Sequence, residues 1–160
     1  MVRLAVVLFL LGSAGAVMGQ AVTACPWLTS GTAATLLGGE VSVTAHVEGT
    51  FAGSCRFVQQ SGASSASIEI LVGPTDPHAC SQDKVKLKAI GNEAVQCRRA
   101  DSPTQQSDII AGRIRDVYFV VNMTNVAGAT RQEPADPRLA DAYGASALER
   151  VAEQVVGNLY

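Results

Sequence analysis

Alternating hydrophobic and polar residues predict an antiparallel sheet in the first half of the chain. Residues 41–47 alternate apolar and polar side chains with a period of two, which is typical of a half-buried strand. Residues 54–59 and 66–72 are rich in β-forming side chains, and the turn-like segment 61–65 separates them. The pattern therefore predicts an antiparallel meander over residues 41–72.

The middle of the chain has a less regular pattern. Residues 73–78 have the composition of a loop. In residues 81–90, three lysines alternate with apolar residues, which favours a strand, although helical spacing is also possible. Residues 94–99 are predicted to form another strand. Residues 99–107, which are polar and include Pro103, are predicted to form a linker.

The longest β-rich run follows at residues 109–123. Its segment Tyr118–Val121 is apolar on both faces, which predicts a central strand. Residues 127–137 again have the composition of a loop. The second half of the chain therefore predicts two or more further strands.

A short helix is predicted near the N-terminus, over residues 28–37. Thr29 or Ser30 can cap its first turn, and Gly38 stands where a left-handed glycine ends a helix. Pro26 and Trp27 precede this helix as an anchor.

A longer helix is predicted at the C-terminus, because apolar residues recur there at helical spacing. These residues are Leu148, Val151, Ala152, Val155 and Leu159. Ser146 and Glu149 match a capping box, which predicts a start at Ser146. The alternative is an earlier start at Asp136 and Pro137, with Gly144 tolerated inside the helix.

This order of elements predicts an α+β fold. We expect one antiparallel sheet with a short N-terminal helix and a longer C-terminal helix packed on it. The length of 160 residues suits a single domain with a leader.

Residues 1–21 have the features of a secretory signal peptide. Arg3 provides a positive charge, residues 4–11 are uninterrupted apolar sequence, and small residues follow. We expect cleavage within residues 16–21, which leaves 22–160 as one disulfide-stabilised domain. The apolar stretch is too short for a membrane anchor, so we expect no transmembrane span after cleavage. The sequence thus predicts a secreted or periplasmic protein.

The four cysteines are predicted to form two disulfides. None stands in the close pairs that a zinc site uses, and an exported chain with an even cysteine count is typically disulfide-bonded. Of three possible pairings we favour Cys25–Cys55 with Cys80–Cys97, because this order closes two local loops. Lipid attachment at Cys25 is an alternative. However, Cys25 lies far from the apolar stretch, and its lipidation would leave an odd number of cysteines for disulfide pairing.

Composition and charge exclude several classes of protein. The net charge is −2 and only 16% of residues are charged, so the chain lacks the basic excess of a nucleic-acid-binding protein. Hydrophobic residues make up 48% of the chain, so the composition is not that of a disordered protein. We expect no nucleic-acid partner.

No catalytic, cofactor-binding or metal site can be assigned from motifs. His46 lies on the polar side of the first strand and is expected to be solvated, and Asp76, His78 and Cys80 provide too few ligands for a metal. Lys84, Lys86 and Lys88 favour a solvated face that discourages edge pairing, with contact to an anion as the alternative.

Short motifs across most of the mature chain give a family resemblance. They are residues 25–29 (CPWLT), 37–39 (LGG), 55–57 (CRF), 90–95 (IGNEAV) and 151–155 (VAEQV). In these motifs the chain resembles small exported bacterial proteins and lipoproteins of unknown function. The resemblance implies a compact α/β sandwich akin to PsbP-like domains, and it implies no catalytic residue. This chain departs from the lipoprotein members, whose lipidated cysteine directly follows the apolar stretch.

These observations favour a bacterial, exported, non-enzymatic binding module of the cell envelope without a cofactor. Its partner would be an envelope or extracellular protein or a small ligand. Alternatives are a small secreted hydrolase, an enzyme accessory subunit, a lipid-anchored lipoprotein, or a purely structural envelope component. A cleft that joins His46 or His78 to an acid and a serine would favour the hydrolase.

Overall fold

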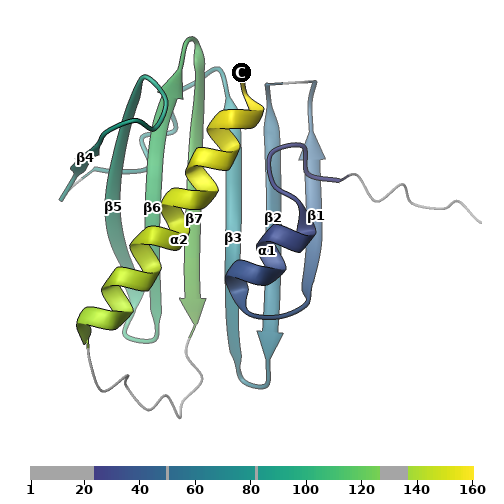
Figure 1. Ribbon diagram of the computed structural model, residues 1–160, viewed down its shortest axis with the longest axis vertical. Helices are drawn as coiled ribbons and strands as arrows, with labels where there is room; N and C mark the ends of the chain where they lie inside the picture. Colours follow the sequence, from purple (N-terminus) through teal and green to yellow (C-terminus); the bar gives the residue numbers. More distant parts are fainter. Residues whose placement is uncertain (1–23, 50, 82, 127–136) are drawn as a thin grey trace, which may run out of the picture.

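The computed structural model describes residues 24–49, 51–81, 83–126 and 137–160 (Figure 1). Two helices and seven strands follow one another along these residues. They are α1 (Ser30–Leu37), β1 (Val41–Val47), β2 (Gly53–Ser61), β3 (Ser64–Gly73), β4 (Val85–Leu87), β5 (Glu93–Ser102), β6 (Gln105–Ile114), β7 (Val117–Val126) and α2 (Pro137–Asn158). The predicted leader, 1–21, and most of the loop 127–137 lie outside the described residues.

The seven strands form one antiparallel sheet in the order β1-β2-β3-β7-β6-β5-β4. Strands β1 to β3 are a meander, β4 to β7 are a second meander, and β3 pairs with β7 to join them. Strand β7 therefore lies at the middle of the sheet, which confirms the prediction of a central strand at Tyr118–Val121. The predicted α+β fold with two helices and two disulfides is confirmed.

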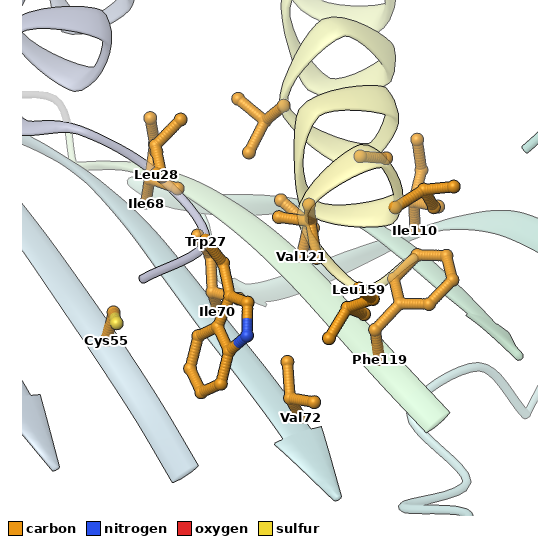
Figure 2. Packing of buried hydrophobic residues seen from close by; sticks show 14 of the residues in the cluster. Trp27, Leu28, Cys55, Ile68, Ile70, Val72, Ile110, Phe119, Val121 and Leu159 are labelled. Carbon is orange, nitrogen blue, oxygen red and sulfur yellow. The ribbon is translucent and has the colours of Figure 1, made fainter. Parts of the chain in front are cut away.

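Both helices cover the same face of the sheet (Figure 1). Helix α1 packs on β1, β2 and β3, and α2 runs obliquely over β6 and β7. The main core fills the space between, and Figure 2 shows part of it. Its largest buried side chains include Trp27, Phe57, Ile68, Ile70, Ile110, Phe119, Val121, Leu148 and Val151. The helix face of the sheet therefore holds most of the apolar burial that stabilises the fold.

Helix α1 has the predicted caps at both ends. The Thr29 hydroxyl accepts a hydrogen bond from the backbone N–H of Thr32 at 3.1 Å. Gly38 ends the helix with φ 78°, a left-handed conformation that glycine adopts without a steric penalty. Both signals are local, so the sequence was sufficient to predict them.

Helix α2 begins at Pro137, so the start predicted at Ser146 is wrong and the earlier alternative is correct. The Ser146 and Glu149 pair lies inside the helix rather than at its N-terminus. A capping box stabilises a helix only where orphan N–H groups exist, and Pro137 is suited to the first helical position because its ring fixes φ. Leu148, Val151, Ala152 and Val155 are buried as predicted.

The predicted linker over residues 99–107 is wrong. Strand β5 continues to Ser102 and β6 begins at Gln105, so Pro103 occupies a tight hairpin turn between two long strands. The segment lacks apolar alternation because this end of the hairpin extends toward solvent, where polar side chains are tolerated on both faces.

Residues 109–123 likewise form parts of two strands rather than one. Strands β6 and β7 meet at a turn in which Arg115 has φ 53°, and the Asn92 side chain accepts a hydrogen bond from the Arg115 N–H at 2.8 Å. Tight hairpin turns with positive φ usually contain glycine or asparagine. Because Arg115 is neither glycine nor asparagine, the local sequence does not predict this turn.

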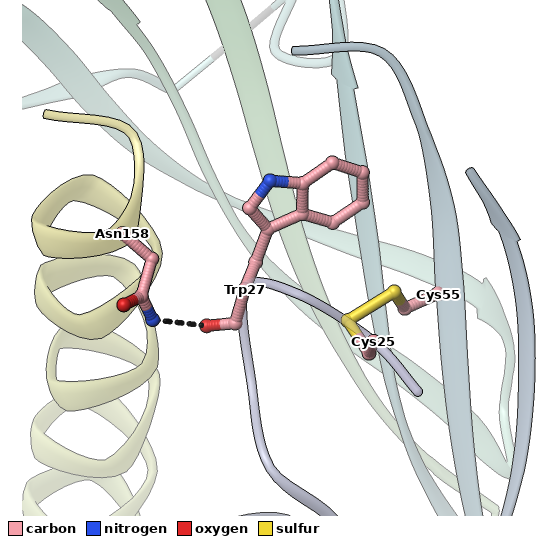
Figure 3. The surroundings of a disulfide bond; sticks show 4 residues. All are labelled: Cys25, Trp27, Cys55 and Asn158. Atoms are coloured by element: carbon pink, nitrogen blue, oxygen red, sulfur yellow. Dashed lines mark hydrogen bonds between the residues drawn. A yellow bond between two sulfur atoms is a disulfide. The ribbon is translucent and has the colours of Figure 1, made fainter. Parts of the chain in front are cut away.

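Both predicted disulfides are present, Cys25–Cys55 and Cys80–Cys97, each with a Cα–Cα distance of 5.8 Å. Cys25–Cys55 attaches the segment before α1 to β2 on the helix side, next to the buried Trp27 (Figure 3). Cys80–Cys97 attaches the connection between β3 and β4 to β5. The two disulfides therefore brace different segments of the fold.

Candidate functional site

The connection between β3 and β4 crosses the face of the sheet that the helices leave uncovered. Cys97 pairs in register with Ile109, and Ile109 is adjacent to Ile110, which belongs to the helix-side core. Since neighbouring strand residues point to opposite faces, Ile109 and Cys97 face away from the helices. Together with Cys80 and Val120 they form a second, smaller buried cluster. This cluster and the Cys80–Cys97 disulfide hold the connection against the sheet.

A cleft of about 430 Å³ opens between this connection and the ends of β4 to β7. Its apolar surface comes from the sheet, chiefly Leu87, Val95, Ala111, Tyr118 and Phe119. Its polar and charged surface comes from the connection and the strand ends, namely Asp76, His78, Lys84, Lys86, Asn92, Glu93 and Arg113. Small-molecule sites typically have this size and this combination of an apolar surface with a few polar groups.

Both acidic residues of the cleft contact a nitrogen-bearing side chain. The Asp76 carboxylate lies 3.3 Å from Nδ1 of His78 and also accepts a hydrogen bond of 2.8 Å from the His78 N–H. Arg113 donates a hydrogen bond of 3.1 Å to Glu93 on the neighbouring strand. Both pairs are exposed to solvent and contribute little to stability.

Two lysines of the cleft have no ion-pair partner among the residues that the structure describes. Lys84 and Lys86 are exposed, and Lys86 pairs in register with Val95 of the cleft surface. Both side chains line the cleft. The cleft lining thus has three positively charged side chains, Lys84, Lys86 and Arg113, against the two acids Asp76 and Glu93.

The connection between β3 and β4, which forms one side of the cleft, has a strained backbone. Two of the four described non-glycine residues with positive φ lie in it, His78 at 48° and Asp83 at 49°, and Ala89 at 67° follows β4. Such conformations cost about 1–3 kcal/mol each and are concentrated at functional sites. The Cys80–Cys97 disulfide lies within this segment and offsets that cost by restricting the unfolded chain.

The sequence candidates are only partly brought together. His78 joins Asp76, Lys84 and Lys86 at the cleft, whereas His46 is exposed on β1 at the opposite edge of the sheet. Lys88 does not line the cleft, and no serine is among the described residues that do. The arrangement of histidine, acid and serine that would favour a hydrolase is therefore incomplete in the described part of this cleft.

Arg113, Glu93 and Tyr118 are site residues that the sequence pattern did not reveal. Arg113 faces Glu93 on one side and Tyr118 on the other because of the registers of β5, β6 and β7. The β6–β7 turn had no sequence signal, so these registers could not be predicted.

The uncovered face also carries a second, smaller and more polar hollow of about 220 Å³ over β2, β3, β7 and β6. Its lining includes Arg56, Glu69, Arg99, Ser107 and Asn122. It has little apolar surface to bury a ligand, so the cleft beside β4 is the stronger candidate.

No family model, curated protein or solved structure shows a significant match to this chain. Within the described ranges, no group of three or more histidine, cysteine, aspartate or glutamate residues is placed to hold a metal ion. In the same part of the chain, no helix has both the length and the apolar character needed to cross a membrane.

Proposed function

We propose that this protein is an exported, non-enzymatic binding module of the bacterial cell envelope, and that the cleft beside β4 binds a small ligand with an anionic group. One observation carries the proposal: a cleft of about 430 Å³ has Lys84 and Lys86 beside an apolar surface. The Cys80–Cys97 disulfide holds one side of this cleft against the sheet. A carboxylate or phosphate would pair with the lysines while an apolar body covers Val95 and Ala111.

The pre-organised wall of the cleft supports a binding role. A ligand loses less free energy to loop ordering when the loop is already fixed, because the cost of ordering has been met during folding. Here the disulfide at Cys80 and the buried cluster fix the wall in advance.

Export is supported by the features of residues 1–21 together with the two disulfides. Disulfides persist mainly in oxidising compartments outside the cytosol. Pairing of Cys25 with Cys55 supports a released domain over a lipid-anchored one, because thioether attachment would consume the Cys25 sulfur. The resemblance to small exported bacterial proteins agrees with this proposal.

The test is a titration of the oxidised domain 22–160 with benzoate, octanoate and phenyl phosphate, followed by amide chemical shifts. We expect perturbations centred on β4, the end of β5 and residues 76–80. Benzamide, which has the same ring without the charge, should bind at least tenfold more weakly.

Matched charge variants locate the binding site. Lys86→Glu should abolish binding of the anionic probes, whereas Lys88→Glu, an equal charge change outside the cleft, should leave it intact. Equal losses in both variants would point to a general charge effect. The absence of any perturbation at the cleft with all three anions would contradict the proposal.

A further inference from the structure

The two edges of the sheet are protected very differently. At one edge β4 is only three residues long, and Lys84, Lys86 and Lys88 lie on or beside it. At the other edge β1 has seven residues, with neither a proline nor an acidic, lysine or arginine residue among them. Short strands and lysines are devices that prevent edge-to-edge association, so only the β4 edge is protected in this way.

The outward-facing backbone groups of β1 can be assigned from its pairing with β2. The Glu48 N–H donates a hydrogen bond of 2.8 Å to the Ala52 carbonyl, which makes these two residues a hydrogen-bonded pair. Such pairs alternate along an antiparallel ladder, so Ser42, Thr44 and His46 bond to β2. The N–H and C=O groups of Val41, Val43, Ala45 and Val47 therefore point away from the sheet.

The apolar side chains of β1 are also incompletely covered. Val41, Val43 and Ala45 are only partly buried at the margin of the core, whereas Phe57 and Ile68 on the next two strands are fully buried. Leu36 and Leu37 of α1 lie at the same margin and are partly exposed too. Within the described ranges, the β1 edge thus has both unpaired backbone groups and apolar surface that a further strand would cover.

We propose that a second copy of this chain occupies this edge, with the two β1 strands antiparallel and Val43 opposite its own symmetry mate. In this register Val41 pairs with Ala45 and Ser42 with Thr44 of the other copy. Val43 and the Val41–Ala45 pairs then exchange hydrogen bonds, because their backbone groups point outward. The apolar side chains of both copies meet on the helix side and extend the core across the interface.

Hydrogen-bonding complementarity and the avoidance of like charges select this register. It places Glu40 of each copy opposite His46 of the other in a non-hydrogen-bonded pair, where side chains approach most closely. A shift of the symmetry axis by one residue, to Thr44, would place Glu40 opposite Glu48, and facing like charges are destabilising. The interface is therefore a two-fold one in which each surface is complementary to itself.

The first experiment measures the mass of the oxidised domain 22–160 by sedimentation equilibrium over a range of concentrations. We expect a reversible dimer. His46→Glu should weaken it about tenfold, because two pairs in which the imidazole can donate a hydrogen bond to Glu40 become two pairs of facing carboxylates. The double variant Glu40→Lys/His46→Glu should restore the original affinity, and Lys88→Glu at the far edge should leave it unchanged.

A cross-linking experiment tests the register itself. Ser42 and Thr44 are exposed on the uncovered face, so a cysteine at either position leaves the core intact. Mixed Ser42→Cys and Thr44→Cys chains should form a disulfide-linked dimer under mild oxidation, and each variant alone should form at least tenfold less. A monomer at every concentration would overturn the proposal, and a strand of another protein would then be the alternative partner of β1. A dimer that is insensitive to His46→Glu and does not cross-link would overturn it as well.

Discussion

The side-chain amide of Asn158 donates a hydrogen bond of 3.1 Å to the backbone carbonyl of Trp27 (Figure 3). The two residues are 131 positions apart, near opposite ends of the described chain. Trp27 is buried against the sheet two residues after Cys25, and Asn158 is the last residue of α2. The bond therefore ties the disulfide-anchored N-terminal segment to the end of the long helix.

Replacement of Asn158 by alanine should lower the free energy of unfolding by about 1 kcal/mol, because the Trp27 carbonyl loses its donor. Urea denaturation of the oxidised domain would measure this loss. Glu153→Ala, an exposed change on the same helix, should shift the free energy by less than about 0.5 kcal/mol. Equal effects of the two variants would show that the bond contributes nothing.

The two disulfides should stabilise the domain by different amounts. In the chain-entropy model the bridge Cys80–Cys97, with a sequence separation of 17, contributes about 3 kcal/mol. The bridge Cys25–Cys55, with a separation of 30, contributes about 4 kcal/mol. Paired Cys→Ser variants, compared by urea denaturation, should rank in this order. The reverse order would mean that native packing of the connection outweighs loop length.

A charge placed on the buried side of α2 should unfold the domain. Leu148 and Val155 are fully buried against the sheet, so Leu148→Asp or Val155→Asp would place an unpaired carboxylate in the core. We expect loss of the cooperative thermal transition, measured by circular dichroism. Gly157→Asp adds the same charge on the exposed side of the helix, where nothing lies within 4 Å of a new Cβ, and should retain the transition.

Local signals predicted much of the fold. The alternation in β1, the caps of α1 and the helical spacing in α2 each depend on residues close in sequence. The favoured cysteine pairing is correct for a similar reason, because each bridge closes one short segment. In these regions sequence neighbours are also spatial neighbours, so their pattern contains the structural information.

The cleft could not be predicted because its residues meet only through strand register. Lys86, Glu93 and Arg113 come from β4, β5 and β6, and Arg115 turns the chain into β7 without the glycine or asparagine that marks such turns. When a turn is not recognised in the sequence, the register of the strands that it connects cannot be predicted. A shift of that register by one residue moves every side chain of a strand to the other face of the sheet. The chemistry of the site therefore depends on non-local pairing.

Gly112 should be essential for the close packing of β5, β6 and β7 beneath the cleft. A Cβ at this position would lie 2.6 Å from Cζ of Phe119 and 2.7 Å from the backbone oxygen of Glu93. The Phe119 ring is buried and the Glu93 oxygen belongs to the ladder, so neither atom can move freely. Gly112→Ala should thus cost about 1–3 kcal/mol in urea denaturation, as overpacking does elsewhere. Gly73→Ala is the matched control, because nothing lies within 4 Å of its Cβ position, at the end of another strand of the same sheet. If both variants were equally stable, the strands would have to separate at Gly112 without cost, contrary to the close contact seen there.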